Sequence, residues 1–333
     1  MLEVLALMAP FFGLVGLGWV AVRRGWLPVD GIGVLMTFVL QFALTALLLR
    51  LSAQGRLQAG ASATLLLVYA ASSLVVMALG LWWARRAGLS RRDGALAALV
   101  TAFPNTGFLG LPLLTSLLGP DAAGPVAATL LVDVLVSCSL AMAWAHSSPA
   151  ARPEEAGDPG PGAALLSSLK GALRNPLLQA MAAGLLISAA GWTLWQPLDD
   201  TLRMLGQSAT PVALVTLGAI VARSQVLATS SAPTRGRAAR SWWWLVALKL
   251  VVHPSLVWLA ATLAAASGHA LPPLSVLALT LAAALPSAAN VSMLAEREGA
   301  DTALVARVIL WTTAAAMLTW LMWSHVLGVR SAV

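Results

Sequence analysis

Two matching interruptions in apolar sequence decide the fold of this chain: Ala102–Pro112, which reads AFPNTGFLGLP, and Ala284–Asn290, which reads ALPSAAN. In each stretch a proline stands in the middle of an apolar segment, where it removes a backbone donor and clashes with the preceding helical turn. The carbonyls four residues earlier, those of Val100 and Ala282, therefore lose their helical partners. Because lipid cannot satisfy such groups, we predict that both breaks are packed inside protein or line a polar cavity.

Composition places the chain in a membrane. Of its 333 residues, 59% are hydrophobic and only 10% are charged, and the mean hydropathy is +0.84. Apolar runs of about 20 residues, the length that crosses the hydrocarbon core, recur along the sequence. The short alternating segments of a transmembrane barrel are absent. We therefore predict an all-α polytopic membrane protein.

The apolar runs form two sets of five. We predict a first five-helix repeat over residues 1–146, a cytoplasmic linker over 147–168 and a second five-helix repeat over 169–333. Because five is odd, the second repeat enters the membrane from the opposite side and is inverted, with the two breaks in spans four and nine. The ten spans are Val4–Val22, Gly33–Leu51, Ala61–Ala84, Gly94–Leu118, Ala122–Ala145, Pro176–Trp195, Leu202–Ala222, Trp242–Ser267, Leu274–Arg297 and Thr302–Val326.

The net charge of +7 reflects orientation rather than a nucleic-acid partner. Basic residues stand at the ends of apolar segments, whereas a nucleic-acid surface gathers them on one soluble face. Most of them fall on the linker side, which the positive-inside rule assigns to the cytoplasm. Both termini are therefore expected to be periplasmic or extracellular, and no nucleic-acid partner is expected.

The first break offers groups that can bind an anion. A half-helix that starts near Asn105 presents unpaired amides and the positive end of its dipole. Pro104 and Thr106 flank this asparagine, and Gly107 allows the backbone to approach closely. The alternative is an ordinary proline kink closed by neighbouring helices, and the matching second break favours a binding site instead.

The second break repeats this chemistry. Asn290 follows Pro286 by four residues, and an amide both donates and accepts. Asn290 and Asn105 can therefore hold a carboxylate or the freed carbonyls, and the sequence leaves both uses open. Ser287 is a further donor, although serine in a membrane helix more often bonds to its own backbone.

Lys249 and His253 lie one turn apart on the same face of the eighth span. A charge at that depth is costly unless it is paired or hydrated, so it marks function by default. Lys249 can bind an anionic substrate, can titrate in a proton cycle when buried, or can snorkel toward the basic side.

Asp133 and Gln41 are the remaining intramembrane polar candidates. Asp133 lies near the middle of the fifth span, where it can be protonated, pair with Lys249 or carry a coupling proton. Gln41 in the second span is better explained by hydrogen bonding between helices. We assign Asp133, His253 and Gln41 to coupling or structure.

Enzyme signatures are missing from the sequence. It contains no G-x-S-x-G elbow, no H-E-x-x-H and no Walker lysine loop, and its four histidines share no metal spacing. We expect no enzymatic activity, no metal and no cofactor.

Three motifs in a fixed order carry a family resemblance: NTGFLGLP at 105–112, TPVALVTLGA at 210–219, and LPSAANV at 285–291 followed by LAE at 294–296. With them the chain resembles the auxin efflux carrier family of membrane transport proteins, in its bacterial branch, over almost its whole length. The resemblance implies that helices four and nine cross at their prolines. It also implies a homodimer in the bacterial inner membrane, with a scaffold of helices one, two, six and seven and a transport unit of helices three to five and eight to ten.

One departure from the family pattern lies in the second span. Gln41 and Thr45 stand where Asn and Pro are usual. A substrate contact from the scaffold therefore cannot be carried over at that place, whereas the crossover is unaffected.

The functional hypothesis is a secondary active transporter of a small organic anion, malonate-like or auxin-like, working by alternating access of the elevator type. Asn105, Asn290 and the half-helix amides would hold the carboxylate, and Lys249 would supply positive charge. One alternative is a passive channel, which would conduct far above carrier rates without saturation. The other is a membrane sensor or scaffold, against which the short linker argues because it offers no output domain. The expected partners are the anion, the lipid bilayer and a second copy of the chain.

Overall fold

The computed structural model describes residues 2–56, 62–146, 166, 170–171, 173–230 and 241–328, without the side chains of 2–8 and 226–230. These residues form an all-helical structure, and the part described contains no β-strand, only an isolated bridge between Pro104 and Ser287. The predicted linker, 147–168, lies outside the described residues except for Leu166.

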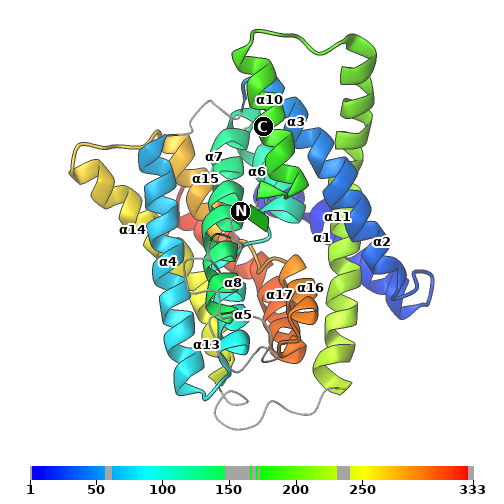
Figure 1. The fold of residues 1–333 in the computed structure, drawn as a ribbon, viewed down its shortest axis with the longest axis vertical. Helices are drawn as coiled ribbons and strands as arrows, with labels where there is room; N and C mark the ends of the chain where they lie inside the picture. Colours follow the sequence, from blue (N-terminus) through cyan, green and yellow to red (C-terminus); the bar gives the residue numbers. More distant parts are fainter. Residues whose placement is uncertain are drawn as a thin grey trace.

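The helices of the first half follow the predicted spans closely (Figure 1). Several spans combine α-helix with a π-helical turn, labelled η. In chain order the elements are α1 (Leu2–Arg23), α2 (Gly31–Phe38), η1 (Val39–Ala43), α3 (Leu44–Ala53), α4 (Ala63–Arg86), α5 (Arg91–Ala102), η2 (Thr106–Gly110), α6 (Leu111–Leu118), the 3-10 turn η3 (Pro120–Ala122), α7 (Ala123–Val132), η4 (Asp133–Cys138) and α8 (Ser139–Ala145).

The second half has the same character. Its elements are α10 (Pro176–Ala189), α11 (Gln196–Ser230), α13 (Trp243–Ala247), the π-helical turn η6 (Leu248–Val252), α14 (His253–Ala266), α15 (Pro273–Ala283), α16 (Asn290–Arg297) and α17 (Thr302–Val326).

The helices support a multi-pass membrane protein. Six described helical stretches are long and apolar enough to cross a bilayer, and four shorter apolar helices accompany them. Two of the shorter ones, Thr106–Leu118 and Pro273–Ala283, are parts of the predicted spans four and nine, which are interrupted near their prolines. The six long stretches are Gly31–Ala53, Ala63–Arg86, Pro120–Ala145, Gln196–Gln225, Trp243–Ala266 and Thr302–Val326.

The sixth and seventh spans differ from the prediction at their boundaries. The sixth helix ends at Ala189 and not at Trp195, because Gly191 turns the chain with a φ of 68°, a conformation that favours glycine. The next helix, α11, already begins at Gln196 and runs for 35 residues to Ser230, beyond the predicted Leu202–Ala222. Apolar runs alone do not mark these ends, because the helix continues through polar residues.

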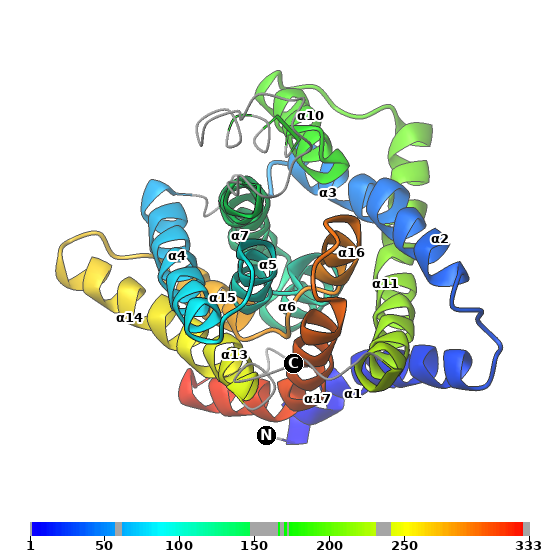
Figure 2. The same ribbon diagram turned by 60° about the horizontal axis from the view of Figure 1, so that its bottom comes forward.

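Glycines allow one group of helices to pack backbone to backbone. α1 packs on α11 and α10 packs on α3, and these elements lie together on one side of Figure 2. A Cβ added to Gly18 would overlap the backbone of Val215, and one added to Gly218 would overlap the backbone of Val15. Small residues at such contacts are typical of membrane helix pairs, whose association depends on close packing.

The two sides of the molecule can be told apart by ion pairs. Arg223 of α11 pairs with Glu296 of α16, and His146, just after α8, pairs with Glu298 at 2.7 Å. The ends of α8, α11 and α16 therefore lie at one side, which we call the linker side. Because α11 is one continuous helix, its start, with Asp199, marks the opposite side.

Candidate functional site

The two interruptions meet in the interior. The N–H of Asn105 donates to the carbonyl of Pro286 at 2.8 Å, and the N–H of Ala288 donates to the carbonyl of Phe103 at 2.9 Å. Together they form the antiparallel bridge between Pro104 and Ser287. Irregular backbone from one half of the chain is thus paired with irregular backbone from the other.

The carbonyls expected to lose their helical partners find others nearby. Ser287 Oγ donates to the carbonyl of Val100 at 2.7 Å, and the N–H of Leu285 donates to Ala282 at 3.2 Å. Lys249 Nζ donates to the carbonyl of Ala283 at 2.6 Å. The carbonyls at the breaks are therefore satisfied by protein groups, as a low-dielectric surrounding requires.

A cavity of about 130 Å³ lies beside this junction. It brings together four side-chain amides, those of Gln41, Asn105, Asn175 and Asn290, and none of its described lining residues carries a charge. We call it the crossover cavity. Its lining residues are Leu40, Gln41, Phe103, Pro104, Asn105, Gly107, Phe108, Leu130, Val134, Asn175, Pro176, Leu177, Ala288 and Asn290.

Hydrogen-bond donors without partners face this region. Asn105 is 2% exposed and its Nδ2 has no partner within the described chain. The backbone N–H groups of Gly107, Phe108 and Asn290 also have no acceptor among the described residues. Unsatisfied buried donors are rare in folded proteins and require an explanation. At the starts of η2 and α16, with no carboxylate in the lining, they suit an anion.

Comparison with known proteins shows the family of this chain. The model of a family described as "Membrane transport protein" matches residues 3–157 and 160–324. The chain belongs to this membrane transport protein family. Among curated proteins, one from Rhizobium meliloti (strain 1021) named "Putative malonate transporter" is 28% identical over 317 residues, covering 94% of this chain and 92% of that protein. The family match confirms the resemblance carried by the three sequence motifs.

Within this membrane transport protein the predicted substrate residues divide into two groups. Pro104, Asn105, Gly107 and Asn290 line the crossover cavity, as does Gln41, which we assigned to coupling or structure. The other predicted contacts, Thr106, Pro286, Ser287 and Lys249, do not line it. The substrate roles of both groups stay predictions.

The second group frames the junction. Pro286 and Ser287 hold it through hydrogen bonds, and the N–H of Ser287 also donates to Thr312 Oγ1 at 3.2 Å. Thr106 is buried, and its Oγ1 has no hydrogen-bond partner among the residues that the structure describes. The fully buried Lys249 does not snorkel, because its ammonium is bonded at the end of α15.

The transport protein holds a second, fully buried polar cluster apart from the cavity. Tyr69 of α4 donates its hydroxyl to Asp133, with O···O distances of 3.1 and 3.2 Å. Its ring lies 5.7 Å from the ring of His253, whose Nε2 is 3.2 Å from Ser73 Oγ. Lys249 is near enough for Coulomb attraction to Asp133, but no ion pair joins these two described residues. The sequence indicated Asp133, Lys249 and His253 but missed Tyr69 and Ser73.

Several of the candidate residues lie in π-helical turns. Gln41 lies in η1, Gly107 in η2, Asp133 in η4 and Lys249 in η6. A π-helical turn adds a residue to the helix, redirects side chains and often marks a functional site. No residue pattern in the sequence predicted these turns.

Asn175 is a lining residue that the sequence reasoning missed. It caps α10 by accepting the N–H of Leu177 at 2.9 Å, and Pro176 follows at the first helical position. An Asn-Pro pair before an apolar run is a start signal for a helix, so the cap was predictable although its position at the cavity was not.

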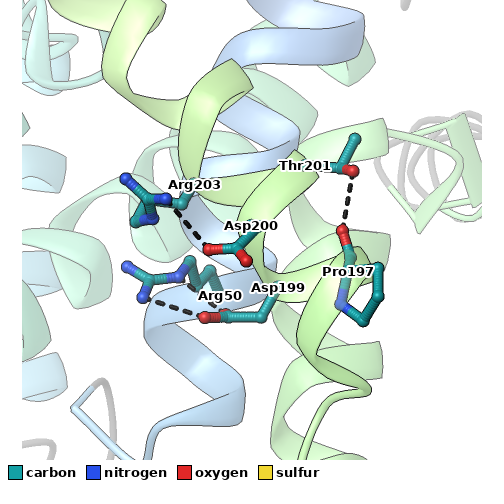
Figure 3. Close-up of polar contacts among 6 residues, drawn as sticks. All are labelled: Arg50, Pro197, Asp199, Asp200, Thr201 and Arg203. Carbon is teal, nitrogen blue, oxygen red and sulfur yellow. Dashed lines mark hydrogen bonds and ion pairs between the residues drawn. The ribbon is translucent and has the colours of Figure 1, made fainter.

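The opposite side of the transport protein has its own cavity, of about 330 Å³. It lies between α3, α6 and α11 and is lined by Arg50, Arg203, Thr115 and Gln207 among others. Both arginines are paired (Figure 3): Arg50 Nε lies 2.7 Å from Asp199 Oδ1, and Arg203 Nη2 lies 2.9 Å from Asp200 Oδ1. The acids neutralise these guanidinium groups.

Proposed function

We propose that this membrane transport protein is a secondary active carrier of a small organic anion, and that the crossover cavity binds its carboxylate. The observation that carries the proposal is the convergence of unpaired donors on a cavity without an acidic residue. Asn105 Nδ2 and the N–H groups of Gly107, Phe108 and Asn290 supply those donors. Donors of this kind, fixed in a low-dielectric site, bind anions strongly.

The proposed architecture is two inverted five-helix repeats whose fourth and ninth helices cross at Pro104 and Pro286. Its support is the antiparallel bridge at the breaks and the placement of one break in each half of the chain. Broken helices that meet at mid-membrane are typical of substrate sites in carriers built from inverted repeats.

The substrate class that we propose is a malonate-like or auxin-like carboxylate. The name of the Rhizobium meliloti relative supports malonate as the first anion to test. An amide-rich cavity fits a carboxylate because each amide N–H can donate to its oxygens.

Alternating access of the elevator type is the proposed mechanism. The scaffold would comprise the first, second, sixth and seventh spans, and the moving unit the remainder. In support, Gln41 and Asn175 approach the cavity from the proposed scaffold, whereas Asn105 and Asn290 approach it from the proposed moving unit. A substrate held at such an interface can be carried across it by sliding of one unit.

Coupling is assigned by proposal to the buried cluster of Asp133, Tyr69, His253 and Lys249. A buried acid beside a buried base is the usual composition of an intramembrane proton relay. Lys249 contributes indirectly to the substrate site in this proposal, because it holds the carbonyl of Ala283 where α15 breaks.

For localisation we propose the inner membrane of a bacterium, with the linker side in the cytoplasm, both termini outside and the carrier assembled as a homodimer. The surplus of arginines at the linker side supports this orientation. Chemical cross-linking in native membranes tests the dimer, and tags at the termini test the orientation.

Transport by the purified protein in liposomes tests the function. We expect saturable uptake of labelled malonate, reduced at least about tenfold by Asn105→Ala or Asn290→Ala because each removes a hydrogen-bond donor to a charged ligand. Asn105→Asp should abolish uptake, since it keeps the shape but repels a carboxylate. Gln54→Ala, which removes an exposed amide beyond the end of α3, serves as the matched control.

Two outcomes separate the alternatives. Flux that rises linearly with malonate concentration, far above carrier rates, would indicate a channel. Malonate binding without transport would indicate a sensor. Unchanged uptake in all the asparagine variants would exclude the crossover cavity as the substrate site.

A further inference from the structure

A larger cavity, of about 360 Å³, adjoins the crossover cavity at the linker side. The two cavities share Val134 and Asn175 in their linings. The larger one continues along η4 and α8 through Cys138 and Met142 to His146. The two cavities therefore lie next to each other, and the larger one reaches the linker side. We call the larger one the inner cavity.

The described side chains that line the inner cavity carry more positive charge than negative charge. Arg174 and Arg297 line it, both exposed, and neither has an ion-pair partner within the described chain. Its one acidic residue in the described lining, Glu298, is engaged by His146 at 2.7 Å. Two guanidinium groups without a partner among the described residues therefore line the cavity, while its carboxylate is paired with His146.

The opposite cavity provides an internal comparison. Its two arginines, Arg50 and Arg203, are each held by an aspartate of α11 (Figure 3). Of these two arginine-lined cavities, the inner one therefore has the stronger positive potential. Cavities lined by one sign of charge concentrate ligands of the other sign and speed their arrival.

We propose that the inner cavity is a capture site for small carboxylates, in which Arg174 and Arg297 hold the anion before it reaches the crossover cavity. The inference rests on the proposed function and adds to it a second binding site, on the linker side. Guanidinium groups suit this ligand because they present paired N–H donors that match a carboxylate. Their exposure fits a capture site, where the anion must also leave.

The chain carries its own probe for this proposal. Cys138 is the single cysteine, and it lines the inner cavity between the arginines and the crossover. A thiol reagent that reaches Cys138 from the linker side enters the cavity that both arginines line. The ratio of the labelling rates of an anionic and a cationic methanethiosulfonate reports the local electrostatic potential. The reactivity of the thiol itself affects both rates alike and therefore cancels in the ratio.

The experiment uses full-length protein in membrane vesicles with the linker side exposed. We expect the anionic reagent to label Cys138 faster than the cationic one, by about three- to tenfold at low salt, and less at high salt because salt screens exposed charges. Malonate, added as the probe anion, should slow labelling. Arg174→Gln and Arg297→Gln should each reduce the preference and raise the KM for malonate taken up from the linker side.

Two further variants test whether the arginine substitutions act indirectly. Arg24→Gln removes an exposed charge after α1 that does not line the cavity, and it should leave the preference unchanged. Glu298→Gln removes the negative charge and should increase the preference for the anionic reagent, an increase that a folding defect would not produce.

The results separate the capture site from the proposed function. If wild-type protein transports malonate but Cys138 is unlabelled, or is labelled equally by both reagents without malonate protection, the capture site is wrong and the carrier stands. If malonate is neither bound nor transported, the proposed function fails. An unchanged KM in both arginine variants also overturns the capture site.

Discussion

At the scale of single residues, the junction depends on groups that replace lost helical hydrogen bonds. Ser287 connects the two halves most directly, because its hydroxyl donates to the carbonyl of Val100 from 187 positions away. Both residues are fully buried. Without the hydroxyl this carbonyl would be left unsatisfied in a site that excludes water.

We expect Ser287→Ala to lower the free energy of unfolding by about 1–3 kcal/mol, the cost of an orphaned buried polar group. Ser255→Ala is the matched control, because Ser255 is only partly buried and its hydroxyl bonds to Val251 one turn back in the same helix. Equilibrium unfolding in mixed detergent micelles measures both. Equal stability of the two variants would contradict a structural role for Ser287.

The buried charges form a second prediction at this scale. Lys249 and Asp133 attract each other without forming an ion pair, and each is fully buried. Lys249→Met leaves the acid without its countercharge, so we expect marked destabilisation, and Asp133→Asn in the same chain should restore part of it. A double-mutant cycle measures the coupling, and strict additivity would show that the two charges are independent.

At the scale of elements, the packing of α1 on α11 requires glycine at the contact. Gly18→Ala should destabilise the protein by about 1–3 kcal/mol, as overpacking does, because the new methyl group meets the backbone of Val215. Gly16→Ala adds the same methyl group to the same helix, where nothing lies within 4 Å. Melting temperatures of the two variants in one detergent provide the comparison. A Gly16→Ala variant as unstable as Gly18→Ala would contradict the packing explanation, because alanine has the higher helix propensity and should not by itself destabilise the helix.

Helix boundaries show what apolar patterning can and cannot predict. The tenth span, Thr302–Val326, was predicted to the residue, because Asp301 caps its start and the run is uniformly apolar. The end of the sixth span was wrong because Gly191, and not the end of the apolar run, turns the chain. The π-helical turns at Gln41 and Lys249 escaped prediction, since they arise from tertiary packing and leave no periodic signal.

At the scale of the whole molecule, the sequence predicted an all-helical membrane protein and its transport family, because composition, span length and three motifs are all local properties. It also indicated Asn105, Asn290 and Gln41, all of which line the crossover cavity. It did not predict that Lys249 is bonded to Ala283 or that Tyr69 joins Asp133. Those contacts depend on how helices that are distant in the sequence pack together, which a single amino-acid sequence does not show.

The most direct test is a cryo-electron microscopy map of the protein with malonate bound. We predict helices interrupted at Pro104 and Pro286, with anion density in the crossover cavity within hydrogen-bond distance of Asn105 and Asn290. Continuous helices through these prolines, or malonate density elsewhere with the crossover cavity unoccupied, would contradict it.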